Sequence, residues 1–366
     1  MNDNKKILIA TGGTGGHVFP AYSLGKFFQK QNVETIISTD LRGFKYLNHY
    51  KDVQIKIINS DTIFKKTFLQ KISSFIKVLT AISQSIYFLI KLKPSVIFGM
   101  GGYSSFPICA AALLLRIPFI LYENNLLLGR ANRYLLPYSK FILCSYREIE
   151  GINQKYKNKI LEVGNLIRED VLNYKIDENK KYNNDNSLNI LILGGSQAAK
   201  IFAEKLPDIF IKLKNKGYDL KIYQQCILNQ QSGLENKYNK INLKNHTFTF
   251  SYDLTKYFSK VNIAITRAGS SMLAELLNCN IPLISIPLAN SADEHQLKNA
   301  QYFKDKGYGF LIEESDIETK LFSLIEDIYK NRDLLKEVII NQKKFRKIDT
   351  KLAIYKNISP LIYKKK

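Results

Sequence analysis

The sequence is poor in residues that could cross-link the chain or hold a metal. Its four cysteines, Cys109, Cys144, Cys226 and Cys279, lie far apart and share no paired spacing. Disulfide frameworks and cysteine-based metal sites need regular, close spacings, so neither is expected here. The chain is therefore expected to work in a reducing compartment.

Long unbroken hydrophobic runs are also lacking. The stretch Val78–Ile90 is short and has polar residues at its centre, while Pro94–Leu115 is interrupted by three glycines and Pro107. A membrane-spanning helix needs about 20 mostly apolar residues in one run, so none is predicted. The segment Met1–Lys6 leads directly into a strand-like run, which leaves no room for a signal peptide.

Acidic residues are scarce relative to basic ones, with 32 Asp and Glu against 54 Lys and Arg, a formal net charge of +22. Such a charge fits nucleic acid, an anionic membrane surface or an anionic substrate, and it also fits lysines spread over solvated faces. A basic nucleic-acid-binding protein is thus one alternative function. The lysines are dispersed, however, and no helix-turn-helix, zinc or RNA-binding signature is present, so no nucleic-acid partner is expected.

Apolar runs alternate with helix-like stretches twice along the chain, which predicts two Rossmann-like α/β domains, each a doubly wound parallel sheet. The strands expected in the first half are Ile7–Ala10, Val33–Ser38, Val53–Ile58, Val96–Phe98, Phe119–Tyr122 and Phe141–Cys144. Those expected in the second half are Ile190–Leu193, Leu220–Tyr223, His246–Phe250, Ile263–Thr266 and Leu283–Ile286.

The domain boundary is placed at Gly164, just before a polar patch, Asp177–Asp185, that is typical of an exposed loop. We therefore expect domains at 1–164 and 165–345, facing each other across a cleft. From Ile317 the pattern is helical to the end, and the last basic segment, about 346–366, is expected to pack back on the first domain.

Two glycine loops, Gly12–His17 and Gly194–Gln197, each follow an apolar run and precede a helix-like segment. Glycine lets the backbone approach a ligand closely, and the first-turn N–H groups of a helix attract negative charge. The loops predict two sites for a phosphate-bearing ligand. Neither fits the G-x-G-x-x-G dinucleotide fingerprint, which disfavours a nicotinamide oxidoreductase.

Three further segments carry polar chemistry. His17 ends the first loop, and an imidazole titrates near neutral pH, so it is a candidate general base or a residue that steadies the turn. In Thr266–Glu275 a glycine ends the strand, two serines can cap a helix, and Glu275 can accept two hydroxyl hydrogen bonds from a ribose. In Asp293–Ala300, Gln296 and Asn299 are candidates to face a sugar.

Together these segments resemble the MurG family of glycosyltransferases, which add N-acetylglucosamine to lipid-linked muramoyl-pentapeptide in peptidoglycan synthesis. The matching segments occur in the family's order and span nearly the whole chain: Gly12–Pro20, Gly99–Tyr103, Glu123–Asn125 with Gly129 and Asn132, Gly164-Asn165 with Arg168, Gly194–Gln197, Arg267–Gly269 with Glu275, and Asp293 with Gln296, Asn299 and Ala300. The resemblance implies the two-domain fold called GT-B.

The resemblance also implies a set of site residues for the donor, UDP-N-acetylglucosamine. In the second domain Ser196 would lie near the diphosphate, Glu275 on the ribose, Ser251 at the uracil and Gln296 at the sugar. The turn that lines the phosphates would consist of Ser270, Ser271, Met272, Leu273 and Ala274. The first domain and the linker would add Thr14, Gly15, Gly16, Asn125 and Arg168. A guanidinium such as that of Arg168 can pair bidentately with phosphate oxygens.

Three positions depart from the family's pattern: Leu166 replaces a proline, Ala198-Ala199 replaces Gly-Ala, and Ser104–Pro107 replaces small residues. They concern the local geometry of the linker and loops. Ala198 adds a methyl group near the expected phosphate approach.

The implied reaction is an inverting transfer to the 4-hydroxyl of the muramoyl sugar, which converts lipid I to lipid II. His17 is the expected base and Glu123 the alternative carboxylate, with helix N-termini and Arg168 stabilising the leaving UDP. No Asp-x-Asp motif is present, so no metal or other cofactor is expected. A UDP-sugar transferase for another glycolipid or a small acceptor is the nearer alternative.

The stretch Thr62–Lys93 has six lysines, no acidic residue and apolar residues at three- and four-residue steps. This pattern is typical of a basic amphipathic helix on an anionic bilayer, and also of a core-facing helix with a lysine-rich outer face. Given a lipid-linked acceptor, we expect membrane contact through Phe64, Lys65, Lys66, Phe68 and Phe75, as a peripheral protein on the cytoplasmic face of the inner membrane. Other proteins of cell-wall synthesis are candidate partners.

Overall fold

The computed structural model describes residues 5–13, 15–60, 68–174, 187–251, 253–289 and 291–363. The side chains of residues 68, 69, 71, 196–199 and 292 are outside this description. The polar patch expected at 177–185 lies outside it as well. The chain divides into two compact units. The first unit comprises residues 1–168 and 347–366, and the second comprises residues 169–346.

The first unit is built on a seven-stranded sheet in the order β3-β2-β1-β4-β5-β6-β7, and all of its described strand pairs are parallel. Its strands are β1 (Lys6–Ala10), β2 (Glu34–Thr39), β3 (Gln54–Ile57), β4 (Val96–Gly99), β5 (Phe119–Glu123), β6 (Ile142–Cys144) and β7 (Ile160–Glu162). Its helices are α1 (Gly15–Lys30), α2 (Leu41–Leu47), α3 (Phe68–Leu92), α4 (Gly102–Leu114), α5 (Arg130–Leu135), η1 (Gln154–Lys159) and α15 (Thr350–Ile362).

The second unit repeats the same winding, with a six-stranded parallel sheet in the order β10-β9-β8-β11-β12-β13. Its strands are β8 (Leu188–Leu193), β9 (Leu220–Gln225), β10 (Lys244–Phe248), β11 (Ile263–Thr266), β12 (Leu283–Ser285) and β13 (Phe310–Leu311). Its helices are α6 (Glu169–Leu172), α8 (Gly195–Asn215), α9 (Leu228–Asn239), α10 (Thr255–Phe258), α11 (Ser270–Asn278), η2 (Ala292–Glu294), α12 (His295–Asp305), η3 (Glu314–Asp316), α13 (Ile317–Lys330) and α14 (Asp333–Lys343).

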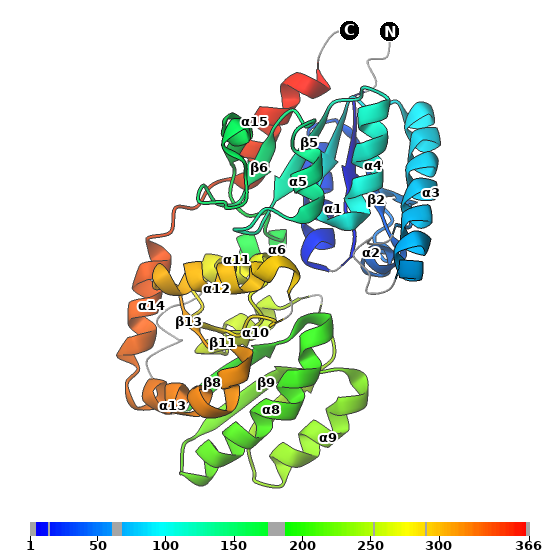
Figure 1. Cartoon of the computed structure of the whole chain (residues 1–366). Coiled ribbons are helices and arrows are strands. Elements are labelled where there is room, and N and C mark those ends of the chain that lie inside the picture. The colour runs from blue at the N-terminus through cyan, green and yellow to red at the C-terminus, as the bar shows by residue number, and fades with distance from the viewer. Residues whose placement is uncertain are drawn as a thin grey trace. The chain divides into compact units, whose positions relative to one another are not determined.

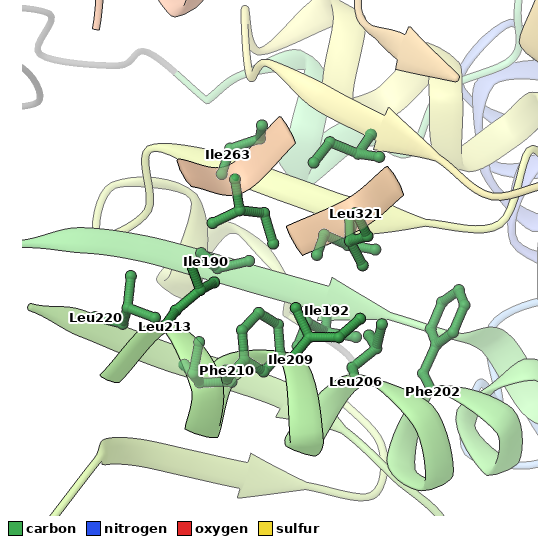
Figure 2. Close-up of a cluster of buried hydrophobic side chains, with 14 of the residues drawn as sticks. Ile190, Ile192, Phe202, Leu206, Ile209, Phe210, Leu213, Leu220, Ile263 and Leu321 are labelled. Atoms are coloured by element: carbon green, nitrogen blue, oxygen red, sulfur yellow. The ribbon is translucent and has the colours of Figure 1, made fainter. Parts of the chain in front are cut away.

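The central strands are continuous apolar runs because helices cover both faces of each sheet (Figure 1). In the second unit, α8 buries one helical stripe, Phe202, Leu206, Ile209, Phe210 and Leu213, at the three- and four-residue spacing of a core-facing helix. Figure 2 shows this stripe lying against Ile190 and Ile192 of β8. Burying each such side chain contributes about 1.5–3 kcal/mol.

The last helix, α15, belongs to the first unit. Ile354, Ile358 and Ile362, spaced four residues apart, are buried in the same cluster as β1 and α1. The ring of Tyr355 lies 6.0 Å from that of Phe28. Asp349 begins the helix by accepting a 3.0 Å hydrogen bond from the Leu352 amide.

The structure matches each expected strand to within three residues at its ends and adds β7 and β13. Both are edge strands of only two or three residues, and their apolar runs are too short to mark a strand in the sequence. The helix α3 spans 25 residues, more than the stretch Val78–Ile90 that was considered as a membrane span, and Ile72–Leu92 is long and apolar enough to cross a membrane. Length and composition alone do not show a span, so the expectation of no membrane-spanning helix stays a prediction. One helix of this kind is weak support for a span, and α3 packs along α4.

Candidate active site

Each sheet reverses its strand order next to its first strand, between β1 and β4 and between β8 and β11. Ligands of doubly wound proteins bind outside the carboxyl ends of the strands at this switch point. The loops and first helical turns that follow these four strand ends contain Gly12, Gly13, Gly15 and Gly16, then Gly101–Ser104, Gly194–Gly195 and Arg267–Gly269. The motifs found in the sequence are thus at the ligand-binding edge of their own sheets.

The loop after β1 is packed closely against its neighbours. A Cβ atom on Gly12 would lie 2.5 Å from the Cβ of Ser104, so only glycine fits. Gly15 and Gly16 begin α1, and His17 lies in the first turn with its side chain half-buried. The Thr11 hydroxyl donates to the His17 carbonyl oxygen at 3.1 Å. Thr14 lies outside the described residues.

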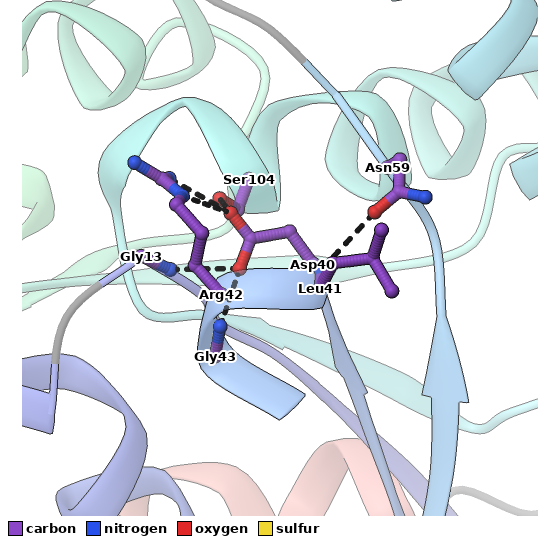
Figure 3. Close-up of polar contacts among 7 residues, drawn as sticks. All are labelled: Gly13, Asp40, Leu41, Arg42, Gly43, Asn59 and Ser104. Carbon is purple, nitrogen blue, oxygen red and sulfur yellow. Dashed lines mark hydrogen bonds and ion pairs between the residues drawn. The ribbon is translucent and has the colours of Figure 1, made fainter. Parts of the chain in front are cut away.

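Asp40, at the end of β2, is a residue that the sequence did not single out. Its Oδ1 accepts from the Gly13 amide at 3.0 Å and the Gly43 amide at 2.8 Å. Its Oδ2 accepts from the Ser104 hydroxyl at 3.1 Å and from the Arg42 guanidinium at 2.8 Å (Figure 3). Burial alone would raise the pKa of Asp40, but the two amides, Arg42 and Ser104 together lower it below its ordinary value.

Glu123, the alternative base, ends β5 with only 4% of its surface exposed. Its Oε1 accepts from the backbone and side-chain amides of Asn125, at 3.1 and 3.0 Å. Its Oε2 accepts from the Gly129 amide at 3.0 Å and the Asn132 side chain at 2.9 Å. Four donors surround this carboxylate, which makes it the organiser of the loop that contains Asn125.

The linker residues pack within the first unit. The Arg168 guanidinium lies 5.8 Å from the ring of Phe19 in α1, which brings it to the helix that follows the first glycine loop. Leu166, the departure from proline, uses its amide to donate to the Tyr122 hydroxyl at 2.9 Å. Proline has no N–H, so this contact depends on the departure. The Thr350 hydroxyl donates to the Asn165 carbonyl at 3.0 Å.

In the second unit, α11 begins directly after Gly269, which occupies the N-cap position. Glycine has no side chain to accept from the first-turn amides, so Ser270 and Ser271 are the first helical residues rather than caps. Ser270, Leu273, Ala274 and Glu275 are buried, and Ser271 and Met272 are partly exposed. An uncapped N-terminus of this kind is suited to an anion.

Side chains of the second unit tie the strand ends together. Arg267 is buried and donates to the carbonyls of Ile286 and Pro287 while pairing with Glu314, so its role is structural. Asn299 donates to the Ala268 carbonyl at 3.1 Å. The Gln296 Oε1 accepts from the Leu288 amide at 3.0 Å.

Two residues before α12 hold an uncommon backbone conformation. Asp293 and Glu294 have φ angles of +53° and +58°, in the left-handed region that most side chains avoid. Each such residue costs about 1–3 kcal/mol, and strain of this kind gathers at functional sites. The strained turn directly precedes Gln296.

The remaining expected residues are placed as follows. Ser251 is partly exposed beyond β10, and its hydroxyl donates to the Asp253 carbonyl. Ser196 and Phe68 belong to α8 and α3, but their side chains lie outside the description, as do Phe64, Lys65 and Lys66 entirely. Phe75 is exposed on α3. Within the described part of the chain, no group of three or more His, Cys, Asp or Glu side chains could hold a metal ion.

Two doubly wound units with glycine loops at their switch points define a two-domain α/β protein of the GT-B type, as the sequence predicted. Solved structures share this fold. MurG of Acinetobacter baumannii matches with a TM-score of 0.78 at 24% identity, covering 97% of this chain and 99% of that one. The structure of S. aureus MnaA with UDP matches with a TM-score of 0.70 at 16% identity, covering 99% of this chain and 98% of that one.

The sequence comparisons give the family. The glycosyltransferase family 28 N-terminal domain matches residues 7–143, and the family 28 C-terminal domain matches residues 189–352. A protein of Pelagibacter ubique is 36% identical over 344 residues, 94% of each chain. One of Rickettsia felis is 35% identical over 353 residues, 94% of this chain and 96% of its own.

Both relatives are named UDP-N-acetylglucosamine–N-acetylmuramyl-(pentapeptide) pyrophosphoryl-undecaprenol N-acetylglucosamine transferase. The chain belongs to this family of glycosyltransferases, the MurG family. The resemblance seen in the ordered motifs is thereby confirmed.

Proposed function

We propose that this chain transfers N-acetylglucosamine from UDP-N-acetylglucosamine to the 4-hydroxyl of the muramoyl sugar of undecaprenyl-diphospho-muramoylpentapeptide, giving lipid II for peptidoglycan. The observation that carries this proposal is the 36% identity to a relative of that name over 94% of both chains. The glycine loops at both switch points support it, because such loops suit the diphosphates of the donor and of the lipid-linked acceptor.

The donor is assigned to the second unit. The uncapped α11 N-terminus with Ser270–Ala274, together with Ser196, receives the diphosphate, and Glu275 accepts from the ribose hydroxyls. Ser251 meets the uracil through its backbone. The side-chain carbonyl oxygen of Gln296 already accepts from the Leu288 amide, so the NH₂ group of Gln296 is the group that donates a hydrogen bond to the sugar. By the family resemblance, Thr14, Gly15, Gly16, Asn125 and Arg168 of the first unit are also assigned to the donor.

The reaction is a direct displacement with inversion at the anomeric carbon. A base removes the proton of the acceptor hydroxyl as that oxygen attacks, and UDP leaves with growing negative charge. His17 is the base in this proposal, because Glu123 already accepts four hydrogen bonds. Arg168 and the helix N-termini stabilise the leaving diphosphate, so transfer proceeds without a metal.

Membrane association is assigned to the outer face of α3. Phe75, Ile76 and Leu79 are each about half exposed there, Lys77 is exposed among them, and Lys91 is exposed near the end of the helix. An apolar face beside lysines is typical of a helix that lies in an anionic interface. The protein is thus proposed to act peripherally on the cytoplasmic face of the inner membrane, where its lipid-linked acceptor lies.

A radiolabelled transfer assay tests the proposal. Label is expected to pass from UDP-N-acetylglucosamine to a lipid-linked muramoyl-pentapeptide, while UDP-glucose and UDP-N-acetylgalactosamine act poorly. Transfer to another glycolipid but not to the muramoyl acceptor would favour the alternative acceptor class. Binding to nucleic acid without any transfer would favour the alternative that rests on charge.

The base assignment gives the first prediction. His17→Ala is expected to lower kcat by about 10²–10⁴-fold, the usual contribution of a general base, with donor Kd unchanged. Turnover is compared with that of His49→Ala, an exposed histidine beyond α2. A His17→Ala enzyme that binds donor normally and keeps full turnover would remove His17 from the mechanism.

A further inference from the structure

The two units hold their glycine loops in a parallel way. Strand β2 lies next to β1 in the first sheet, and β9 lies next to β8 in the second. At the end of β2, the Asp40 carboxylate accepts from the Gly13 amide at 3.0 Å. At the end of β9, the side-chain oxygen of Gln225 accepts from the Gly195 amide at 3.3 Å. Residues at corresponding strand ends thus supply the hydrogen-bond-accepting side chain for each loop.

The two hydrogen-bond-accepting side chains, Asp40 and Gln225, differ in charge and in the partners that they bind. Gln225 is neutral and donates its own amide to the Thr249 carbonyl at 3.2 Å. Asp40 is 4% exposed and also binds Ser104, which lies in the first turn of α4, shortly after β4. Because β2, β1 and β4 are adjacent, one carboxylate joins the ends of three neighbouring strands. The Gly13 amide is engaged inside the protein.

A carboxylate behind a phosphate-binding loop carries an electrostatic cost, since like charges repel strongly where water is excluded. Arg42 offsets it. Its guanidinium pairs with Asp40 Oδ2 at 2.8 Å and lies 4.9 Å from the ring of Tyr103, which precedes Ser104 in the first turn of α4. Its Nη2 would lie 3.6 Å from a Cβ on Gly13. The positive charge therefore lies at the glycine loop, and its side chain is 55% exposed.

We propose that Asp40 is a positioning residue for the transfer reaction: it fixes the loop of Gly13 to the first turn of α4 at Ser104, while Arg42 neutralises it toward the anionic acceptor. This inference rests on the proposed function. It assigns the pair to the acceptor side, and it assigns the neutral Gln225 to the donor side.

Kinetics of four variants test the pair, with kcat and KM measured for both substrates. Asp40→Ala is expected to lower kcat/KM for the lipid-linked acceptor about 100-fold, because the glycine loop and the first turn of α4 lose their shared anchor. Asp40→Asn retains one oxygen for the Gly13 and Gly43 amides, and is expected to lose about tenfold or less. Both are expected to change donor KM less than acceptor kcat/KM, because only residues 14–16 of this loop are assigned to the donor.

Arg42→Gln is expected to raise acceptor KM about tenfold with kcat retained, because it exposes an uncompensated carboxylate. Adding Asp40→Asn to Arg42→Gln removes that charge, so the double variant should recover most of this loss. A merely structural pair would not recover in this way. Gln225→Ala is the matched control, expected to raise donor KM and to leave acceptor KM unchanged.

Amide hydrogen exchange separates this inference from the proposed function, because it needs no substrate. Asp40→Ala should speed exchange at Gly13, Gly15 and Gly16 and at Ser104 relative to Asp40→Asn. If the wild type fails to transfer but these rates rise, the proposed function fails while the anchoring stands. Unchanged exchange, or a double variant no better than Arg42→Gln, would overturn the inference.

Discussion

Buried carboxylates hold the loops of the first unit, and each does so by accepting from backbone amides. Asp40 and Glu123 lie at the ends of β2 and β5, and both are about 4% exposed. The lowered pKa of Asp40 means that its ionised form contributes stability above its ordinary value of 3.8, lost as the pH falls through the lower folded value. Asp40 therefore stays charged near neutral pH.

Glu123→Gln distinguishes a loop organiser from a base. The introduced NH₂ group would face donors that now point at a carboxylate oxygen, so the free energy of unfolding should fall by about 1–3 kcal/mol. Urea denaturation measures this fall, with the exposed Glu162→Gln at the end of β7 as the control. If Glu123 only organises the loop, turnover should fall only as far as the displacement of Asn125 lowers it. Wild-type stability combined with a 100-fold or greater loss of kcat would instead make Glu123 the base.

The residues that sequence could find are those whose chemistry shows locally. His17 adjoins a glycine loop, and Glu275 follows a strand-ending glycine, so both were named from their neighbours alone. Asp40 contacts Ser104, 64 positions away, and this contact exists only because β2, β1 and β4 are adjacent. No local sequence pattern reveals the strand order that creates this contact.

Among the elements, α3 has one buried face and one exposed face, and both follow from a single amphipathic pattern in its sequence. Its inner residues Ala81, Ser85 and Leu89 are buried, and the helix packs along α4. Phe75 and Ile76 are each 55% exposed on its outer side. The periodicity predicted the helix and its two faces, but it could not distinguish a face that packs in the core from a face that contacts a membrane. Strands were easier to predict, because burial on both sides makes them unbroken apolar runs, except for the short edge strands β7 and β13.

The outer face of α3 can be tested with vesicles. Changing Phe75, Ile76 and Leu79 together to serine should weaken binding to anionic vesicles by about tenfold or more, because each apolar side chain contributes of the order of 1 kcal/mol when it enters the interface. Sedimentation with liposomes measures this, and added salt should weaken wild-type binding as well. The matched control is Leu228→Ser with Ile340→Ser, two exposed apolar residues of the second unit. Equal binding of wild type and triple variant, or indifference to lipid charge, would remove α3 from the membrane contact.

At the scale of the whole molecule, two units of the same winding are proposed to take different ligands. The net charge of +22 suits anionic ligands in general and does not choose between them. The two units differ in the residue at the end of the strand beside each glycine loop. This residue is the neutral Gln225 in the second unit and Asp40, whose charge is balanced by Arg42, in the first. The similarity of the units was visible in the sequence as two rounds of alternation, whereas this difference required the structure.

If the donor belongs mainly to the second unit, UDP-N-acetylglucosamine should stabilise the two units unequally. A ligand that binds only the folded form adds about 2.7 kcal/mol to the free energy of unfolding at 100 times its Kd. Hydrogen exchange at that excess should slow most in α11 and in the strained turn before Gln296, and least in β2, β3 and α15 of the first unit. UDP alone should give most of this protection, since the diphosphate and ribose make the assigned contacts, and Glu275→Gln should weaken it. The Glu162→Gln enzyme, altered in the first unit, should respond as the wild type does. Protection confined to the first unit would reverse the assignment of the two glycine loops.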